Sequence, residues 1–274
     1  MTARIAAVAI AVAVAAAPSG AGAGGIHSNT ALSPGRGQFV YRGQLRFHRL
    51  VGGGDTAVAA DRLAIVNVGL WAVHERLAII GVVPLVAQTG TARPPAPGEA
   101  VDLDDIGAGD ARVMAKLRLL STDGRGSTAR VAAVAGAVVP SHDAPFSSES
   151  YGAIAGVVAT LQTLERSIDV DAAWTFATGD GARGDDALAY DAAYTHTLIT
   201  DQSMDGDIWQ LRAVIEVNGS STTGGRHMVF ASPGLVLVLP EIAVELSAQV
   251  PVVRDLGGDI APGTVAVAGF RRTW

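Results

Sequence analysis

Strand-length segments in which apolar and polar residues alternate recur along most of the chain. The clearest is Trp209–Asn218, and Phe39–His48 shows the same pattern with a cationic polar side. Successive side chains of a β-strand point to opposite faces, so each segment has one apolar and one polar face. The longest apolar run after the N-terminus, Leu77–Ala87, has eleven residues, whereas a helical membrane span needs about 20. The pattern therefore predicts β-structure and no membrane-spanning helix.

The connections between these segments alternate between long polar loops and short turns. Transmembrane barrels sort their connections in this way and have an even number of strands, whereas a soluble sandwich has no reason to do so. Strands of about 10 residues also suffice to cross a bilayer when they are tilted. We therefore predict an all-β, transmembrane, antiparallel up-and-down β-barrel of about twelve strands. The segments are Phe39–His48, Arg62–Val73, Leu77–Thr89, Ala111–Leu120, Ala129–Val139, Tyr151–Leu164, Ile168–Ala177, Leu188–Leu198, Trp209–Asn218, Met228–Leu239, Ile242–Val250 and Thr264–Trp274.

Composition narrows the classes of function. Charged residues make up 17% of the chain, below the roughly 25% that is usual for soluble domains. An alanine- and valine-rich soluble protein has a similar composition, so this observation alone leaves both classes open. The net charge of −6 argues against nucleic-acid binding, which favours a basic surface. The sequence has no cysteine, which excludes disulfides and thiolate metal sites, and we expect neither a metal nor a cofactor.

The N-terminus has the pattern of a secretory signal peptide. Arg4 precedes the apolar run Ile5–Ala17, and Ala21-Gly22-Ala23 fits a small-residue cleavage site. A membrane helix is the competing interpretation, but the run is too short and ends in Pro18-Ser19-Gly20. We predict a signal peptide over residues 1–23, a flexible lead-in over 24–37 and a bacterial outer-membrane barrel over 38–274.

The final segment, Thr264–Trp274, has a strand pattern that continues to the last residue. Chain ends usually fray unless they are tied down, so we expect this strand to close the barrel by pairing antiparallel with Phe39–His48. It resembles the terminal strand of bacterial outer-membrane barrels, whose final aromatic residue is read by the barrel-assembly machinery. The resemblance implies Phe270 and Trp274 as the assembly signal, both facing the outer-membrane lipids. Arg272 on the same face is a misfit. The inward positions are then Val265, Val267, Gly269 and Arg271.

Three stretches resemble the outer-membrane family called "MetA-pathway of phenol degradation", whose members are labelled transporters. Leu70–Pro84 is similar to the family's strand, short turn and strand ending in proline. Asp104–Ala111 resembles its Gly-x-Gly-Asp entry to a strand, and Ser232–Trp274 resembles its last three strands. The family's usual Pro-Thr-Gly is absent at Pro140-Ser141-His142-Asp143. The resemblance implies an association with the degradation of aromatic compounds and identifies no substrate.

Charged residues on the predicted strands fall on the polar faces, and we predict that they line the lumen. A charge on the lipid face would cost about 2–4 kcal/mol at the bilayer midplane. The basic and acidic residues either set a transverse field in an open pore or pair with each other in a plugged lumen. Ile154, Val158 and either Ile80 or Val82 would make the other side of the lumen apolar. The predicted lumen or solute-path residues are Arg42, Arg46, Arg112, Lys116, Arg118, Arg130, Asp169, Asp171, Asp191, Arg212, Glu216, Glu245 and Arg271.

These patterns predict an outer-membrane channel or transporter for small hydrophobic or aromatic molecules. A lipid hydrolase is an alternative, with a serine and His196 near the lipid face, but no nucleophile elbow or supporting acid is present. Ser141-His142-Asp143 cannot form a triad, because adjacent residues of one loop do not converge as a relay. A plugged barrel with a structural or surface role is a further alternative. We predict no catalytic residue and no enzymatic activity.

Overall fold

The computed structural model describes residues 25–52, 57–93, 101–141, 145–178, 185–202, 208–255 and 260–274. The predicted signal peptide, residue 24, residues 53–56, and His142 and Asp143 lie outside the described residues. Within the described ranges, no helix is long and apolar enough to span a membrane.

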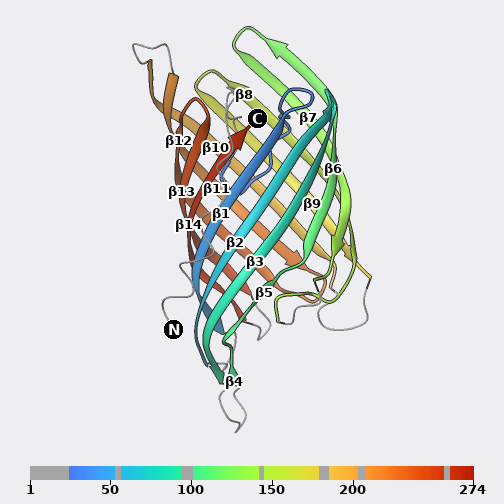
Figure 1. Cartoon of the computed structure of the whole chain (residues 1–274), viewed down its shortest axis with the longest axis vertical. Coiled ribbons are helices and arrows are strands. Elements are labelled where there is room, and N and C mark those ends of the chain that lie inside the picture. The colour runs from blue at the N-terminus through green and yellow to red at the C-terminus, as the bar shows by residue number, and fades with distance from the viewer. Residues whose placement is uncertain are drawn as a thin grey trace.

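The described strands form one closed antiparallel sheet (Figure 1). Of its 14 strands, β4 and β5 are short additions beside β3, which leaves twelve strands around the barrel. β1 pairs with β14 and β2 pairs with β3, so the sheet has no open seam. The predicted fold class and strand number are therefore confirmed. The strands are β1 (Phe39–Gly52), β2 (Ala57–His74), β3 (Leu77–Arg93), β4 (Val101–Asp102), β5 (Asp105–Ala108), β6 (Ala111–Gly124), β7 (Ser127–Val139), β8 (Gly152–Thr163), β9 (Arg166–Ala177), β10 (Ala187–Gln202), β11 (Ile208–Thr222), β12 (His227–Val238), β13 (Ile242–Asp255) and β14 (Ile260–Thr273).

Alternation along each strand separates an apolar outer face from a mixed inner face. In β1, Leu45 and Phe47 are 43% and 52% exposed on the outside, whereas Gln44 and His48 are buried inside. The same rule settles the register of β2 and β3, which the sequence left ambiguous because both of their faces are apolar. Ala72 and Ile80 point into the barrel and are buried.

Pro84 lies inside β3 without interrupting the barrel. β3 pairs with β6 up to Val82 and with β5 from Leu85 onward, so the proline occupies the point where its partner changes. A proline cannot donate to a ladder and is tolerated at such irregularities. The stretch between the predicted segments Leu77–Thr89 and Ala111–Leu120 is partly strand, because β3 continues to Arg93 and both β4 and β5 pair with it.

The short connections among the described residues gather at one end of the barrel, the top in Figure 1. They include Glu75–Arg76 between β2 and β3, Arg125–Gly126 between β6 and β7, and Leu164–Glu165 between β8 and β9. The start of β1 and the end of β14 lie at this short-turn end too. The described residues of the connection between β7 and β8, 140–141 and 145–151, lie at the opposite end.

The first and last strands close the barrel in the predicted antiparallel register. Phe39 and Trp274 exchange backbone hydrogen bonds of 3.0 and 2.8 Å, and their rings are 5.9 Å apart. Val265, Val267 and Arg271 are buried inside, and Phe270 is 38% exposed outside. Arg272, the misfit on the outer face, donates to Glu241 at 3.1 Å and lies over the Trp274 ring at 5.4 Å. These contacts accommodate its charge at the rim.

The segment before β1 differs from the flexible lead-in that the sequence predicts over 24–37. Residues 25–38, here named the luminal segment, enter the barrel, and hydrogen bonds join residues 25–32 to its inner wall. Ile26 and Ala31 are fully buried, and Ser28 is 4% exposed. The physical reason is that this segment brings hydrogen-bond donors and acceptors to charged strand residues that would otherwise be buried without partners.

We expect removal of Trp274 to impair closure of the barrel. The change removes two backbone hydrogen bonds to Phe39 and the aromatic contact beside them, where the last strand pairs with the first. The fraction of protein that shows a heat-dependent gel shift in detergent should fall. The control is Trp71→Ala, which removes an exposed aromatic side chain from the same rim and leaves the seam intact. Equal losses in the two variants would contradict a specific role of the last residue.

Candidate functional site

The inner face of the barrel carries all thirteen charged residues that the sequence places there. Lys116, Asp169, Asp171, Glu216, Glu245 and Arg271 are at most 8% exposed. The others lie on the same face of their strands as buried inward residues: Arg46 alternates with outward Leu45 and Phe47, and Arg112 with outward Val113. Their role in a solute path stays a prediction, but their inward direction is a feature of the fold.

One wall of the lumen binds the start of the luminal segment through Glu216 of β11. Its carboxylate accepts hydrogen bonds from the backbone N–H of His27 at 3.0 and 3.1 Å and of Ser28 at 3.2 Å. The Ser28 hydroxyl adds a bond of 3.0 Å. Ile26 packs into an apolar cluster with Val214, Val236, Val265 and Val267. The carboxylate is therefore satisfied by the luminal segment rather than by a cationic side chain.

Strands β9, β8 and β6 bind the middle of the luminal segment. Asp171 of β9 accepts from the Asn29 backbone N–H at 2.8 Å, and Thr160 of β8 accepts from the Ala31 N–H at 2.8 Å. Lys116 of β6 donates to the carbonyl oxygens of Thr30 and Leu32 at 2.9 and 2.6 Å. The segment thus spans the lumen from β11 to β6, and both walls position it.

A buried ion cluster lies where the luminal segment begins. Glu245 of β13 accepts from Arg42 of β1 at 2.8 Å and from the Arg271 Nε of β14 at 2.6 Å. Arg42 also donates to the Ile26 carbonyl oxygen, and the Gln44 amide donates to the same oxygen at 2.7 Å. Glu245 and Arg271 lie on the consecutive strands β13 and β14, and closure of the barrel adds Arg42 from β1. They correspond to the pairing alternative that the sequence left open.

Another group of polar residues lies on the long-loop side of this cluster. Asp191 accepts from the Asn218 amide at 2.7 Å, and Asn218 in turn accepts from Ser232 at 2.5 Å and Gln249 at 3.3 Å. Arg46 donates to Gln44 at 2.9 Å. Asp191 and Asp171 are directly opposite in the β9–β10 register. Carboxylates therefore dominate the β9–β11 side of the lumen, as the sequence predicts.

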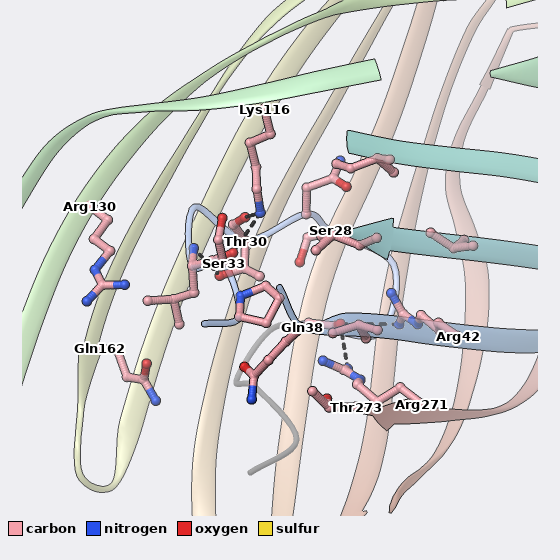
Figure 2. Close-up of a pocket in the computed structure, with 18 of the residues that line it drawn as sticks. Ser28, Thr30, Ser33, Gln38, Arg42, Lys116, Arg130, Gln162, Arg271 and Thr273 are labelled. Carbon is pink, nitrogen blue, oxygen red and sulfur yellow. Dashed lines mark hydrogen bonds between the residues drawn. The ribbon is translucent and has the colours of Figure 1, made fainter. Parts of the chain in front are cut away.

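A cavity of about 500 Å³ opens at the short-turn side of the luminal segment. One side of it is apolar and is formed by Val68 and Leu70 of β2 with Ile80 of β3. The remaining wall carries cationic and amide side chains that point toward the cavity (Figure 2). We call this cavity the chamber; its charged lining residues are Arg42, Lys116, Arg130, Arg212 and Arg271. The chamber combines an apolar surface with a basic one.

The sequence does not reveal the contribution of the luminal segment. His27-Ser28-Asn29-Thr30 is a run of side chains that form hydrogen bonds, but it lacks the periodicity by which the strands are recognised. The sequence also predicts the apolar lining of the lumen only in part. Ile80 lines the chamber, whereas Ile154 and Val158 are buried elsewhere on the inner face.

The features expected of a lipid hydrolase do not assemble around His196. Its ring stacks on the outward Tyr194 at 6.4 Å with an interplanar angle of 7°, and its Nδ1 has no hydrogen-bond partner in the described part of the chain. A catalytic base needs a nucleophile within hydrogen-bond reach and a group that orients it. In the same described ranges, no group of three or more histidine, aspartate or glutamate side chains could hold a metal ion.

Comparisons with known proteins bear on the fold. No family model and no curated protein matches the sequence. The structure is similar to the crystal structure of the COG4313 outer membrane channel from Pseudomonas putida F1, with a TM-score of 0.55 and 10% identity over 89% of this chain and all of that chain. The β-domain of the Bordetella autotransporter BrkA has a TM-score of 0.47 and 14% identity over 87% of this chain and 100% of that chain. The first likeness establishes an outer-membrane-type barrel fold.

We expect Glu216→Ala to release the luminal segment. The substitution leaves the backbone N–H groups of His27 and Ser28 without their carboxylate acceptor, and hydrogen bonds to a charged group contribute about 1.5–3 kcal/mol. Amide hydrogen exchange in residues 26–33 should therefore accelerate by about 10- to 150-fold. Exchange in the β11 and β12 ladder should change little. Glu241→Ala, which removes a carboxylate at the outer rim, is the control. Unchanged exchange in Glu216→Ala would show that other contacts hold the segment.

Proposed function

We propose that the protein is an outer-membrane channel for small hydrophobic or aromatic molecules. The observation that carries the proposal is a closed twelve-strand barrel whose lumen contains the chamber, with one apolar wall and one charged wall. A passage that offers both surfaces suits a solute with an apolar body and a polar group. No step of such transport requires a cofactor.

The distribution of apolar and charged residues supports a location in the outer membrane. Large apolar side chains that include Phe47, Leu246 and Ile215 are 52%, 57% and 63% exposed on the outer face, whereas the thirteen charged residues predicted for the lumen point inward. A bilayer admits only structures whose backbone polar groups are internally paired, and a closed barrel satisfies this requirement. The signal-peptide pattern over residues 1–23 and the named function of the P. putida channel agree with the location. Phe270 and Trp274 would then serve the assembly machinery.

The choice of solute class depends on the lining of the chamber and on the family resemblance. Val68, Leu70 and Ile80 give an apolar surface on adjacent strands, against which a flat hydrocarbon ring can pack. The stretches that resemble the phenol-degradation family point to aromatic compounds by association. Both observations favour small aromatic solutes over sugars, which need many hydrogen-bonding partners.

The luminal segment is the part of the protein that such a channel must accommodate. It crosses the lumen between Glu216 and Lys116, so a solute passes beside it or displaces it. Its extensive hydrogen bonds also favour a second candidate function, a plugged barrel with a structural or surface role. The two candidates differ in whether ions and solutes cross the barrel.

Deletion of residues 26–36 should raise the single-channel conductance in planar bilayers. The deletion empties the lumen and leaves residues 37 and 38 to lead into β1, so the expected increase is severalfold. The deleted protein must retain its heat-dependent gel shift, which separates a wider pore from a misfolded one. If neither the full-length protein nor the deleted protein conducts ions, the channel function is wrong and the plugged-barrel function is supported.

Substitutions on the apolar wall should weaken the interaction with aromatic solutes. We expect a neutral aromatic such as benzamide to reduce the potassium chloride current through the wild-type channel. The double variant Val68→Ser and Leu70→Ser should reduce this block, because the ring loses apolar area against which to pack. Val66→Ser is the matched control on the same strand and face, outside the chamber. An equal block in all three proteins would contradict an aromatic site on β2.

A further inference from the structure

We infer that the chamber is a binding site for small organic anions, with a carboxylate as the preferred charged group. The inference deepens the proposed channel function, because it names the solute chemistry that the short-turn end of the lumen would select. It follows from an excess of hydrogen-bond donors and positive charge at one end of the lumen.

The charges that line the chamber are unbalanced. Five cationic side chains line it, and no aspartate or glutamate does so among the described residues. Arg42 and Arg271 share the single carboxylate of Glu245. Lys116 has backbone carbonyl oxygens as hydrogen-bond acceptors, and Arg212 donates to the neutral Gln210 amide at 3.0 Å. The described lining of the chamber therefore carries an excess of positive charge.

Arg130 also keeps much of its capacity to bind an anion. Its ion pair with Asp123 has an N–O distance of 3.5 Å, and the Asp123 side chain is 63% exposed. Exposed ion pairs of this kind contribute little. The buried Nε of Arg130 has no partner among the described residues. A guanidinium binds a carboxylate best through two parallel N–H bonds, and Arg130 has donors available for this geometry.

Additional donors without partners gather around the same end of the lumen. The Thr273 hydroxyl lines the chamber, and Thr273 is 4% exposed. Thr195 lines a separate small recess together with Gln162, Glu165 and Arg212. In the described part of the chain, the hydroxyl oxygens of Thr273 and Thr195 have no hydrogen-bond partner. Buried polar groups are normally satisfied, and an oxygen atom of an anion in the chamber can accept from Thr273.

The donors lie around one small cavity rather than over an extended surface. Arg130 and Gln162 lie on one side of it and Arg271 and Thr273 on the other, with Ser33 and Gln38 of the luminal segment between the two groups (Figure 2). The volume of about 500 Å³ is within the range of small-molecule sites, about 300–1,000 Å³. Val68, Leu70 and Ile80 face this lining and can cover an apolar body.

Asp169 is the carboxylate that could cancel this charge from within the lumen. It lies in the same row of the β7–β9 register as Arg130, Thr160 donates to it at 2.5 Å, and it does not line the chamber. Glu216 is likewise occupied by the backbone of residues 27 and 28. Both carboxylates therefore already accept hydrogen bonds, and neither lines the chamber.

The test compares benzoate with neutral benzamide, both titrated calorimetrically into the purified full-length barrel in detergent. We expect benzoate to bind, and we expect Arg130→Gln with Arg212→Gln to weaken its affinity by about tenfold or more. Binding of benzamide should change little. Inorganic phosphate should compete weakly with benzoate, because it lacks the apolar body. Arg62→Gln is the matched control, since Arg62 points inward and donates to Gln88 outside the chamber.

Conductance separates a failure of this inference from a failure of the channel function. In a potassium chloride gradient, the double variant should shift the reversal potential toward cation selectivity. If the wild-type barrel binds benzoate, the double variant does not, and the barrel conducts no ions, then the anion site is supported and the channel function is wrong. A conducting wild-type barrel overturns the anion site if it binds no benzoate or if the variant and wild type have equal affinities. Each variant must show the heat-dependent gel shift of the folded barrel.

Discussion

Closure of the backbone hydrogen-bond ladder between β1 and β14 is the constraint on which the structure depends. An open sheet would expose a row of unpaired N–H and C=O groups at each edge, and in hydrocarbon each would cost several kcal/mol. The antiparallel register from Val40–Thr273 to Gly52–Ile260 removes both edges. It also brings Arg42 of β1 to the Arg271–Glu245 pair of β14 and β13. The complete ion cluster therefore exists only in the closed barrel.

Closure also determines which side chains are buried inside the barrel. Because side chains alternate, an apolar outer face directs every second residue of each strand into a narrow lumen, and many of these residues are charged. Burial of a charge is costly unless it is paired or hydrogen-bonded. Glu245 is paired with two arginines, whereas Glu216 and Asp171 are satisfied by backbone N–H groups of the luminal segment. The segment and the acidic wall therefore stabilise each other.

The sequence predicts those parts of the molecule that depend on a period of two. The strands, the closing pair and the inward direction of the charged residues follow from alternation in single segments such as Phe39–His48. The luminal segment could not be predicted in this way, because its residues from His27 to Thr30 bind strands more than 100 positions away. The chamber depends on which walls face each other across the lumen, and β4 and β5 depend on pairing with the extension of β3.

The luminal segment divides the polar lumen into parts with different electrostatic character. On the long-loop side, Asp191 lies in an amide and hydroxyl network with Asn218. On the short-turn side, Arg130 and Arg212 face a cavity without carboxylates in its described lining. Groups that share no partner contribute almost independently to free energy. Neutralising Arg130 and Arg212 can therefore alter anion binding without releasing the segment from Glu216, and this independence makes the two roles of the lumen separable by mutation.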